Sequence, residues 1–255
     1  MKAIKLFSAA ILVLATASSC KKEARPLPAD NRPKISKIEA TDGSYAMNFS
    51  YNGQGRLAET RDNSFIVKYA YPTGSFNYTI YNTSNVKGYD LADLSIQNGR
   101  VTYFNYRDFN ASGEPSSSTP TTVEYDANGF QAKKSYESYS YITEVTGQNM
   151  TKLTKYSNGT QSQQISFEYY TDKQSKFNVN WFEFYYFDHI LNDKELFGKQ
   201  SANLLKKVTS QSASTTTVYE FSYVTDANGL VKEYTINTTK NGVAFAPYTY
   251  KLTWQ

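Results

Sequence analysis

One histidine, the aspartate before it and a few glutamates are the residues whose types could support catalysis. A hydrolase needs a nucleophile and a base placed together, and a catalytic zinc ion usually needs three protein ligands. His189, next to Asp188, is the only histidine, and no GxSxG or HExxH stretch occurs. Glu183, Glu195 and Glu220 carry no local signature of paired carboxylates, whose separation depends on the fold. We therefore expect no enzyme, no metal site and no cofactor, and we keep a carboxylate-based glycan hydrolase as the alternative.

Loops in which Asp or Asn precedes Gly recur along the chain, and such loops can bind calcium. An EF-type calcium loop needs Asp or Asn at alternating positions and a bidentate Glu several residues later. The loop 126–129 (DANG) offers two oxygens and then runs into an alternating segment, while the related loop 52–55 (NGQG) contains no acid. In a turn, the first Asp or Asn bonds the backbone ahead and Gly supplies the left-handed conformation. We predict that these loops are turns between strands.

An aromatic run at residues 181–187 is the remaining candidate for a binding surface. Trp181, Tyr185 and Tyr186 are the members that could be exposed and could stack on a sugar ring or meet a partner protein. The competing interpretation is that the run fills an end of the sheet. Exposure of these three side chains is therefore the property that separates a binding surface from a packing role.

The first twenty residues have the pattern of a lipoprotein leader. Lys2 and Lys5 precede an apolar stretch that is too short to span a bilayer, and small residues lead to Cys20, the only cysteine. The stretch Ala17–Cys20 resembles a bacterial lipobox, in which the cysteine is acylated. We predict a signal peptide over residues 1–19, lipid attachment at Cys20, a Pro-rich tether over residues 20–34 and a single β domain over residues 35–255.

The composition excludes a nucleic-acid-binding protein. Removing residues 1–19 takes away two of the 27 basic residues and none of the 23 acidic ones, so the mature chain is close to neutral. Its Lys and Arg residues are scattered rather than gathered in a stripe. The 23 tyrosines, together with abundant Ser and Thr, are typical of strands whose faces are partly exposed to solvent.

Side-chain alternation with a period of two predicts the fold. In the segment 45–51 (YAMNFSY), every second residue is large and apolar or aromatic, and the same pattern recurs at 65–71, 76–81, 165–170, 219–223 and 248–254. Alternation of this kind is typical of antiparallel strands with one buried face and one wet face. We predict an all-β fold, an antiparallel meander of repeated hairpins that forms a long twisted sheet. The Ser- and Pro-rich segment 109–121 is predicted to be a loop.

Residues 180–210 break the alternation, because apolar residues occur there at both odd-numbered and even-numbered positions. Helical spacing of Phe184, Phe187, Ile190 and Leu191 predicts a short helical insert near residues 183–200. Strands with aromatic ends would also suit a transmembrane barrel. The lipobox, the Lys- and Glu-bearing strands and the predicted insert argue against that alternative.

Two groups of motifs resemble known proteins. The stretches YNGQG (51–55), YDANG (125–129) and VTDANG (224–229) resemble YD/RHS-type hairpin repeats. The stretch FGKQSANLLKKVTS (197–210), followed by a strand, DANG and another strand, is similar to a family of Bacteroidetes cell-envelope lipoproteins of unknown function. The resemblance implies a cell-envelope location and an antiparallel β architecture, and it carries no catalytic residue.

The predicted role is a non-enzymatic binding or scaffold module for a glycan or another envelope protein, with a purely structural spacer as a further alternative. The predicted location is the envelope of a Gram-negative bacterium, anchored by lipid to the outer membrane. The side of that membrane stays open, because only Glu23 provides an acid just after the cysteine.

Overall fold

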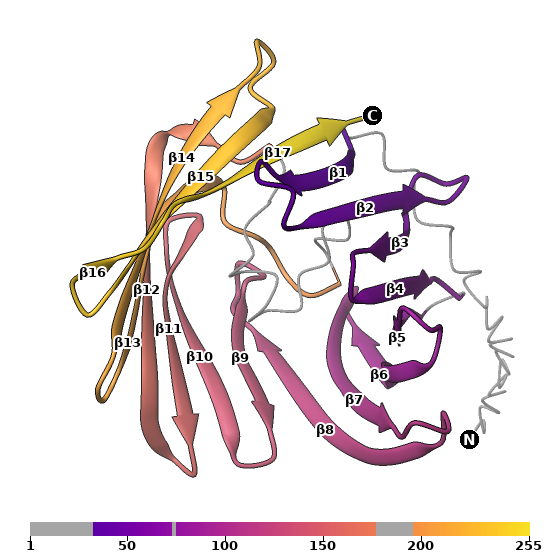
Figure 1. Cartoon of the computed structure of the whole chain (residues 1–255). Coiled ribbons are helices and arrows are strands. Elements are labelled where there is room, and N and C mark those ends of the chain that lie inside the picture. Colours follow the sequence, from indigo (N-terminus) through magenta and orange to yellow (C-terminus); the bar gives the residue numbers. More distant parts are fainter. Residues whose placement is uncertain (1–32, 73–74, 177–195) are drawn as a thin grey trace, which may run out of the picture.

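The computed structural model describes residues 33–72, 75–176 and 196–255 (Figure 1). Within these ranges the chain forms seventeen β-strands and no helix. The strands are β1 Ile35–Ala40, β2 Ala46–Tyr51, β3 Leu57–Arg61, β4 Phe65–Ala70, β5 Asn77–Asn82, β6 Lys87–Gln97, β7 Arg100–Phe109, β8 Pro115–Tyr125, β9 Gln131–Tyr136, β10 Tyr139–Thr146, β11 Asn149–Ser157, β12 Thr160–Gln174, β13 Asn203–Ser212, β14 Thr216–Thr225, β15 Val231–Lys240, β16 Val243–Ala244 and β17 Tyr248–Trp254.

The strands close into a barrel. Strand β16 has two residues and pairs only with β15, whereas the other sixteen strands each pair antiparallel with their neighbours around a ring. Strand β17 returns to β1, with Ile38 opposite Leu252, and this pairing joins the two ends of the sheet (Figure 1). The prediction of an open, long twisted sheet is therefore wrong. Alternation and turn residues are the same in an open and a closed meander, and closure depends on one pairing between distant parts of the chain.

The predicted helical insert is also wrong where the structure describes it. Residues 183–195 lie outside the described ranges, and residues 196–200 form a turn and an irregular segment. The predicted loop at 109–121 is shorter than expected, because the turn covers residues 110–114 and strand β8 begins at Pro115. Ser, Thr and Pro occupy six of the seven exposed positions of β8, and this composition resembles that of a loop.

The barrel wall is uneven in height. Strands β1 to β5 have five or six residues, whereas β12 has fifteen. The long strands β10 to β15 stand on one side of Figure 1 and the short strands β2 to β5 on the other. A ring of sixteen strands is too wide for side chains of the wall alone to fill, as it is in porins.

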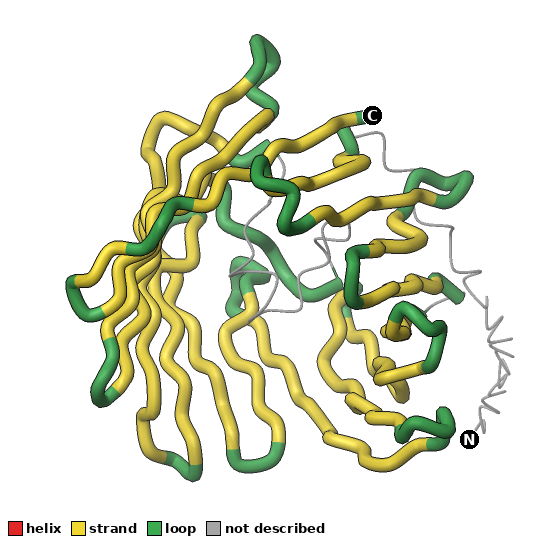
Figure 2. Tube along the Cα trace, viewed as in Figure 1, coloured by secondary structure: helices red, strands yellow, loops and turns green. Residues whose placement is uncertain are grey.

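A connection between β12 and β13 helps to fill this barrel. Its described part, residues 196–202, passes inside the outline of the ring of strands (Figure 2). Leu196 and Phe197 belong to the buried core, and the Phe197 ring lies 6.0 Å from Phe76 and 6.1 Å from Phe104 in edge-on contacts. The interior is therefore packed against this connection at one end, which we call the capped end.

Backbone hydrogen bonds fasten the connection to the wall at the capped end. The Val101 N–H donates to the Leu196 carbonyl (2.7 Å), the Lys199 N–H to the Gly129 carbonyl (2.9 Å) and the Ala202 N–H to the carbonyl of Gln148 (3.0 Å). These bonds join the connection to the start of β7, then to the β8–β9 turn and then to the β10–β11 turn. A buried irregular segment needs such partners, because each unpaired polar group of the backbone would cost free energy.

The Asp- and Asn-led loops are turns, and their side chains bond the backbone ahead. One carboxylate oxygen of Asp126 accepts hydrogen bonds from the N–H groups of Asn128 and Phe130, both at 2.9 Å. Asn52 and Asp226 bond the residues two and four positions later in the same way. Each turn is completed by a glycine with positive φ, +89° at Gly129. This is the turn chemistry that the residue types predict.

Candidate functional site

The buried side chains identify the interior face of the wall. Because side chains alternate along a strand, neighbours on paired strands form rows that face either inward or outward. Rows that contain the buried core residues face inward, and three of them are Phe104–Thr121–Tyr136–Tyr139, Val123–Lys134–Tyr141–Lys155 and Tyr223–Tyr234–Tyr250. The interior face is consequently rich in tyrosine.

The outer face of the wall is polar. Two of its rows are Ser50–Glu59–Lys68–Thr79–Asp90–Arg107–Ser118 and Asn237–Glu220–Lys207–Glu168. Lysines on this face pair with glutamates, as at Lys207–Glu168 (3.7 Å) in the second row and at Lys152–Glu144 (2.8 Å) in a further outer row. Over the whole described part of the chain only six large apolar side chains are exposed: Phe65, Ile142 and Val224, which are far apart in the sequence, and Val243, Phe245 and Tyr248, which lie together at β16 and the start of β17. The outer face is therefore mostly polar and charged.

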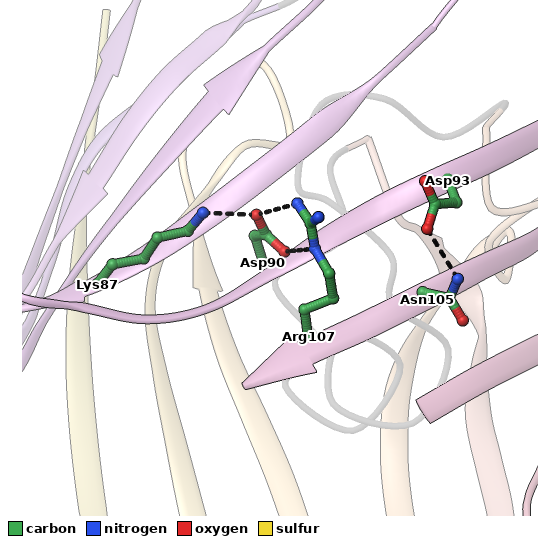
Figure 3. Close-up of polar contacts among 5 residues, drawn as sticks. All are labelled: Lys87, Asp90, Asp93, Asn105 and Arg107. Atoms are coloured by element: carbon green, nitrogen blue, oxygen red, sulfur yellow. Dashed lines mark hydrogen bonds and ion pairs between the residues drawn. The ribbon is translucent and has the colours of Figure 1, made fainter. Parts of the chain in front are cut away.

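A cluster of charged residues on the outer face joins β6 to β7 (Figure 3). Both carboxylate oxygens of Asp90 accept hydrogen bonds from the Arg107 guanidinium, each at 2.9 Å, and Lys87 Nζ lies 2.7 Å from one of them. The Asp90 side chain is 6% exposed. Burial alone would raise the pKa of Asp90, but the hydrogen bonds and charges of Arg107 and Lys87 outweigh it and hold this pKa below its ordinary value.

This arrangement makes Asp90 a structural residue. A general acid or base must exchange its proton near neutral pH. Asp90 stays ionised there, and its oxygens are already occupied by two cations. In the same close-up, the Asn105 amide donates to Asp93 (2.9 Å), which holds the irregular stretch of β6 at which Asp93 has a φ of +53°. The two contacts clamp neighbouring strands together.

Burial keeps the interior tyrosines neutral. Removal from water is the main cause that raises the pKa of Tyr69, Tyr45 and Tyr250 above the ordinary tyrosine value. Their phenol groups thus carry no charge at physiological pH. Hydroxyl groups and ring faces, rather than charges, are what these residues offer on the interior face.

One group of interior residues combines aromatic rings with amines, and we call it the tyrosine–lysine cluster. It consists of Tyr136, Tyr139, Tyr141 and Lys155, on β9, β10 and β11. The rings of Tyr136 and Tyr141 stack at 5.9 Å with their hydroxyls 2.9 Å apart, and the Tyr139 ring lies 5.5 Å from Tyr136. Lys155 Nζ lies 5.0 Å from the centre of the Tyr139 ring and 5.7 Å from that of Tyr141. Rings and an ammonium group therefore form one surface beside the β9–β10 turn.

Sequence reasoning missed this cluster. The stretch 135–141 (SYESYSY) shows the alternation that places its tyrosines on one face, but the contact with Lys155 depends on the register between β10 and β11. The two-residue turn also relies on Glu137, which adopts a φ of +47° without being Gly or Asn. A search for aromatic residues at alternate positions beside a lysine-bearing strand would have found it.

The residues predicted from sequence as functional lie outside the described ranges. They are Cys20, Trp181, Tyr185 and Tyr186, and the histidine considered for catalysis, His189, lies there too. The structure does not test lipid attachment at Cys20 or exposure of the aromatic run. Among the carboxylates weighed for glycan hydrolysis, Glu220 is described, and it stands on the outer face opposite Lys207.

Two kinds of structural feature are absent from residues 33–72, 75–176 and 196–255. No group of three or more His, Cys, Asp or Glu side chains is arranged to hold a metal ion there. Likewise, none of the elements described in these ranges is a helix long and apolar enough to cross a membrane.

Comparison with known proteins identifies the fold. The chain matches no protein-family model, and no curated protein is similar to it. Among solved structures, it is similar to a porin-like protein from Bacteroides uniformis, with a TM-score of 0.60 and 13% sequence identity over 87% of this chain and 98% of the other. The fold is thus a porin-like antiparallel β-barrel.

Proposed function

We propose that this protein is a non-enzymatic binding protein of the bacterial cell envelope, anchored by lipid at Cys20, whose barrel stands in water rather than in the bilayer. One observation carries the proposal, the polarity of the two faces of the wall. A membrane-spanning barrel presents an apolar band about 25 Å tall to lipid and keeps polar residues inside. In this barrel the outer rows are polar and charged, and the interior rows are aromatic and aliphatic.

The energetic cost of lipid around this wall supports the proposal. A lysine or arginine on the lipid face of a barrel costs about 2–4 kcal/mol at the bilayer midplane. The outer face carries Lys68, and it carries Arg107, Lys152 and Lys207 together with their acidic partners. Several such charges would outweigh the gain from the six exposed apolar side chains. A lipid anchor at the N-terminus would keep a water-exposed barrel at the membrane surface.

The interior face is the part of the barrel suited to binding. Ligand sites are concave surfaces lined by aromatic and apolar side chains with a few polar groups that fix orientation. The partly exposed tyrosines of the interior rows supply ring faces and hydroxyls together: Tyr136 on β9, Tyr139 on β10, Tyr223 on β14 and Tyr250 on β17. These are the groups that stack on and hydrogen-bond to sugar rings, so a glycan is the ligand class that this surface favours.

The experiment is to produce the mature chain from residue 20 with Cys20→Ala and to purify it without detergent. We expect a folded, monodisperse protein with the circular dichroism of a β-sheet protein, because the outer face is already polar. Aggregation in buffer together with recovery of a folded species only in detergent would contradict the proposal.

A further inference from the structure

We propose that the tyrosine–lysine cluster of Tyr136, Tyr139, Tyr141 and Lys155 binds an acidic sugar, with the Lys155 ammonium group pairing with the sugar carboxylate. The inference rests on the proposed function, a binding protein with an aromatic interior, and names the ligand class for one site on that interior.

The lysine is the first observation. No carboxylate among the described residues lies within ion-pair distance of Lys155 Nζ, and its cross-strand neighbours, Tyr141 and Gln163, are neutral. Five outer-face lysines differ, because each has an acidic partner: Lys37–Glu39, Lys87–Asp90, Lys133–Glu124, Lys152–Glu144 and Lys207–Glu168. Lys155 therefore brings a positive charge to the interior face without a described counter-charge, and an anionic ligand would supply one.

The ring faces are the second observation. Tyr136 and Tyr139 are partly exposed and form the accessible part of an aromatic group whose third ring, Tyr141, is buried against Tyr136. The C–H faces of a pyranose pack on such rings, and the Tyr136 hydroxyl, which is bonded to that of Tyr141 at 2.9 Å, has a remaining lone pair for a sugar hydroxyl. An apolar ligand would leave the ammonium group of Lys155 without a counter-charge, which is unfavourable.

A buried hydroxyl beside the rings is the third observation. Thr121 lies opposite Tyr136 on the interior face and is fully buried. Its Oγ1 has no hydrogen-bond partner within the described part of the chain. Buried hydroxyls usually have a partner, so an unmatched one next to a polar aromatic surface points to a group that is missing from it.

The test uses isothermal titration calorimetry on the full mature chain with Cys20→Ala. The two probes are a galacturonate oligomer and a galactose oligomer of equal length, which differ in the carboxylate. We expect the galacturonate oligomer to bind and the galactose oligomer to bind at least about tenfold more weakly, because an ionic hydrogen bond is lost. The affinity for galacturonate should fall as salt rises.

Variants locate the site. Lys155→Gln should weaken galacturonate binding about tenfold or more, and it should reduce the preference over galactose. Lys152→Gln is the matched control, because Lys152 is on the same strand but on the outer face beside Glu144, and it should leave binding unchanged. Tyr139→Ala should weaken both oligomers by removing a ring face.

Each result decides a separate point. Equal binding of the two oligomers would retain a sugar site but overturn the carboxylate assignment. Binding of galacturonate that is insensitive to Lys155→Gln would overturn the site. Failure to bind either oligomer by a chain that is folded and soluble without detergent would overturn this inference alone, whereas a requirement for detergent would overturn the proposed function.

Discussion

Gly198 provides the sharpest test of how the connection is held at the capped end. Its φ is +92°, and a Cβ atom there would lie 2.9 Å from a ring carbon of Tyr125, 3.1 Å from the Gly129 carbonyl oxygen and 3.2 Å from the Gln131 nitrogen. Two of these neighbours belong to the backbone of the β8–β9 turn and of β9, so they cannot rotate away. Gly198→Ala must therefore disturb either the turn or the connection that packs on it.

Two costs add in this variant. A side chain at positive φ costs about 1–2 kcal/mol, and forcing an extra carbon into a packed contact costs about 1–3 kcal/mol. We expect Gly198→Ala to lower the free energy of unfolding by about 2–5 kcal/mol on this basis. Gly159→Ala is the matched control, because Gly159 has a φ of +76° but a Cβ atom there would meet no other atom within 4 Å. Gly159→Ala should lower the free energy of unfolding only by the cost of a side chain at positive φ, about 1–2 kcal/mol.

Urea unfolding followed by tyrosine and tryptophan fluorescence measures both variants under the same conditions. The difference between them reports the packing of the connection against the β8–β9 turn. Equal losses for Gly198→Ala and Gly159→Ala would show that the connection does not depend on this contact, and the description of the capped end would then be incorrect.

Further predictions concern the ion cluster and the turns. Asp90→Asn should lower the free energy of unfolding by about 1–3 kcal/mol at pH 7. This range lies below that of a fully buried ion pair, because Arg107 is partly exposed. Since the pKa of Asp90 is lowered in the folded state, its contribution is complete above the unfolded value near 4 and is lost as pH falls through the folded value. Urea titrations should show a smaller difference in the free energy of unfolding between the original protein and Asp90→Asn at pH 3 than at pH 7. A difference that is larger at pH 3 would contradict the assignment. Tyr125→Phe should cost about 0.5–1.5 kcal/mol in a urea titration, because the Tyr125 hydroxyl donates to the Val101 carbonyl at 2.7 Å. Calcium should leave the melting temperature unchanged in a thermal scan, because Asp126 is engaged by its own turn, whereas a rise abolished by Asp126→Ala would indicate a calcium site.

The local structure was readable from the sequence, because it depends on neighbouring residues. Alternation at 45–51 predicts a strand there, and β2 covers Ala46–Tyr51. The DANG stretch predicts a turn, and Asp126 and Gly129 make it. Both features follow from backbone chemistry within a few residues, so no distant contact can reverse them.

Closure and the tyrosine–lysine cluster could not be read in the same way. Closure depends on Ile38 meeting Leu252, two ordinary strand residues more than two hundred positions apart. The contact of Lys155 with Tyr139 depends on the register across β10 and β11. The charged strand residues argue against a transmembrane barrel when only the sequence is read, but charges on the outer face are compatible with a closed barrel. They bear on the proposal that the wall faces water, and they do not bear on closure.

The central claim, a barrel wall that faces water, can be measured directly by spin labelling. With Cys20 lipidated, single cysteines at Ser166, Thr209 and Val218, outward neighbours on β12, β13 and β14, would carry a nitroxide, with Ser214 in the β13–β14 turn as the reference. The lipidated protein is bound to liposomes, and collisions of each label with oxygen and with a water-soluble nickel complex are compared. We predict that all three labels collide with the nickel complex as readily as the label at Ser214. Labels shielded from nickel and accessible to oxygen, as in a lipid-facing wall, would contradict the account.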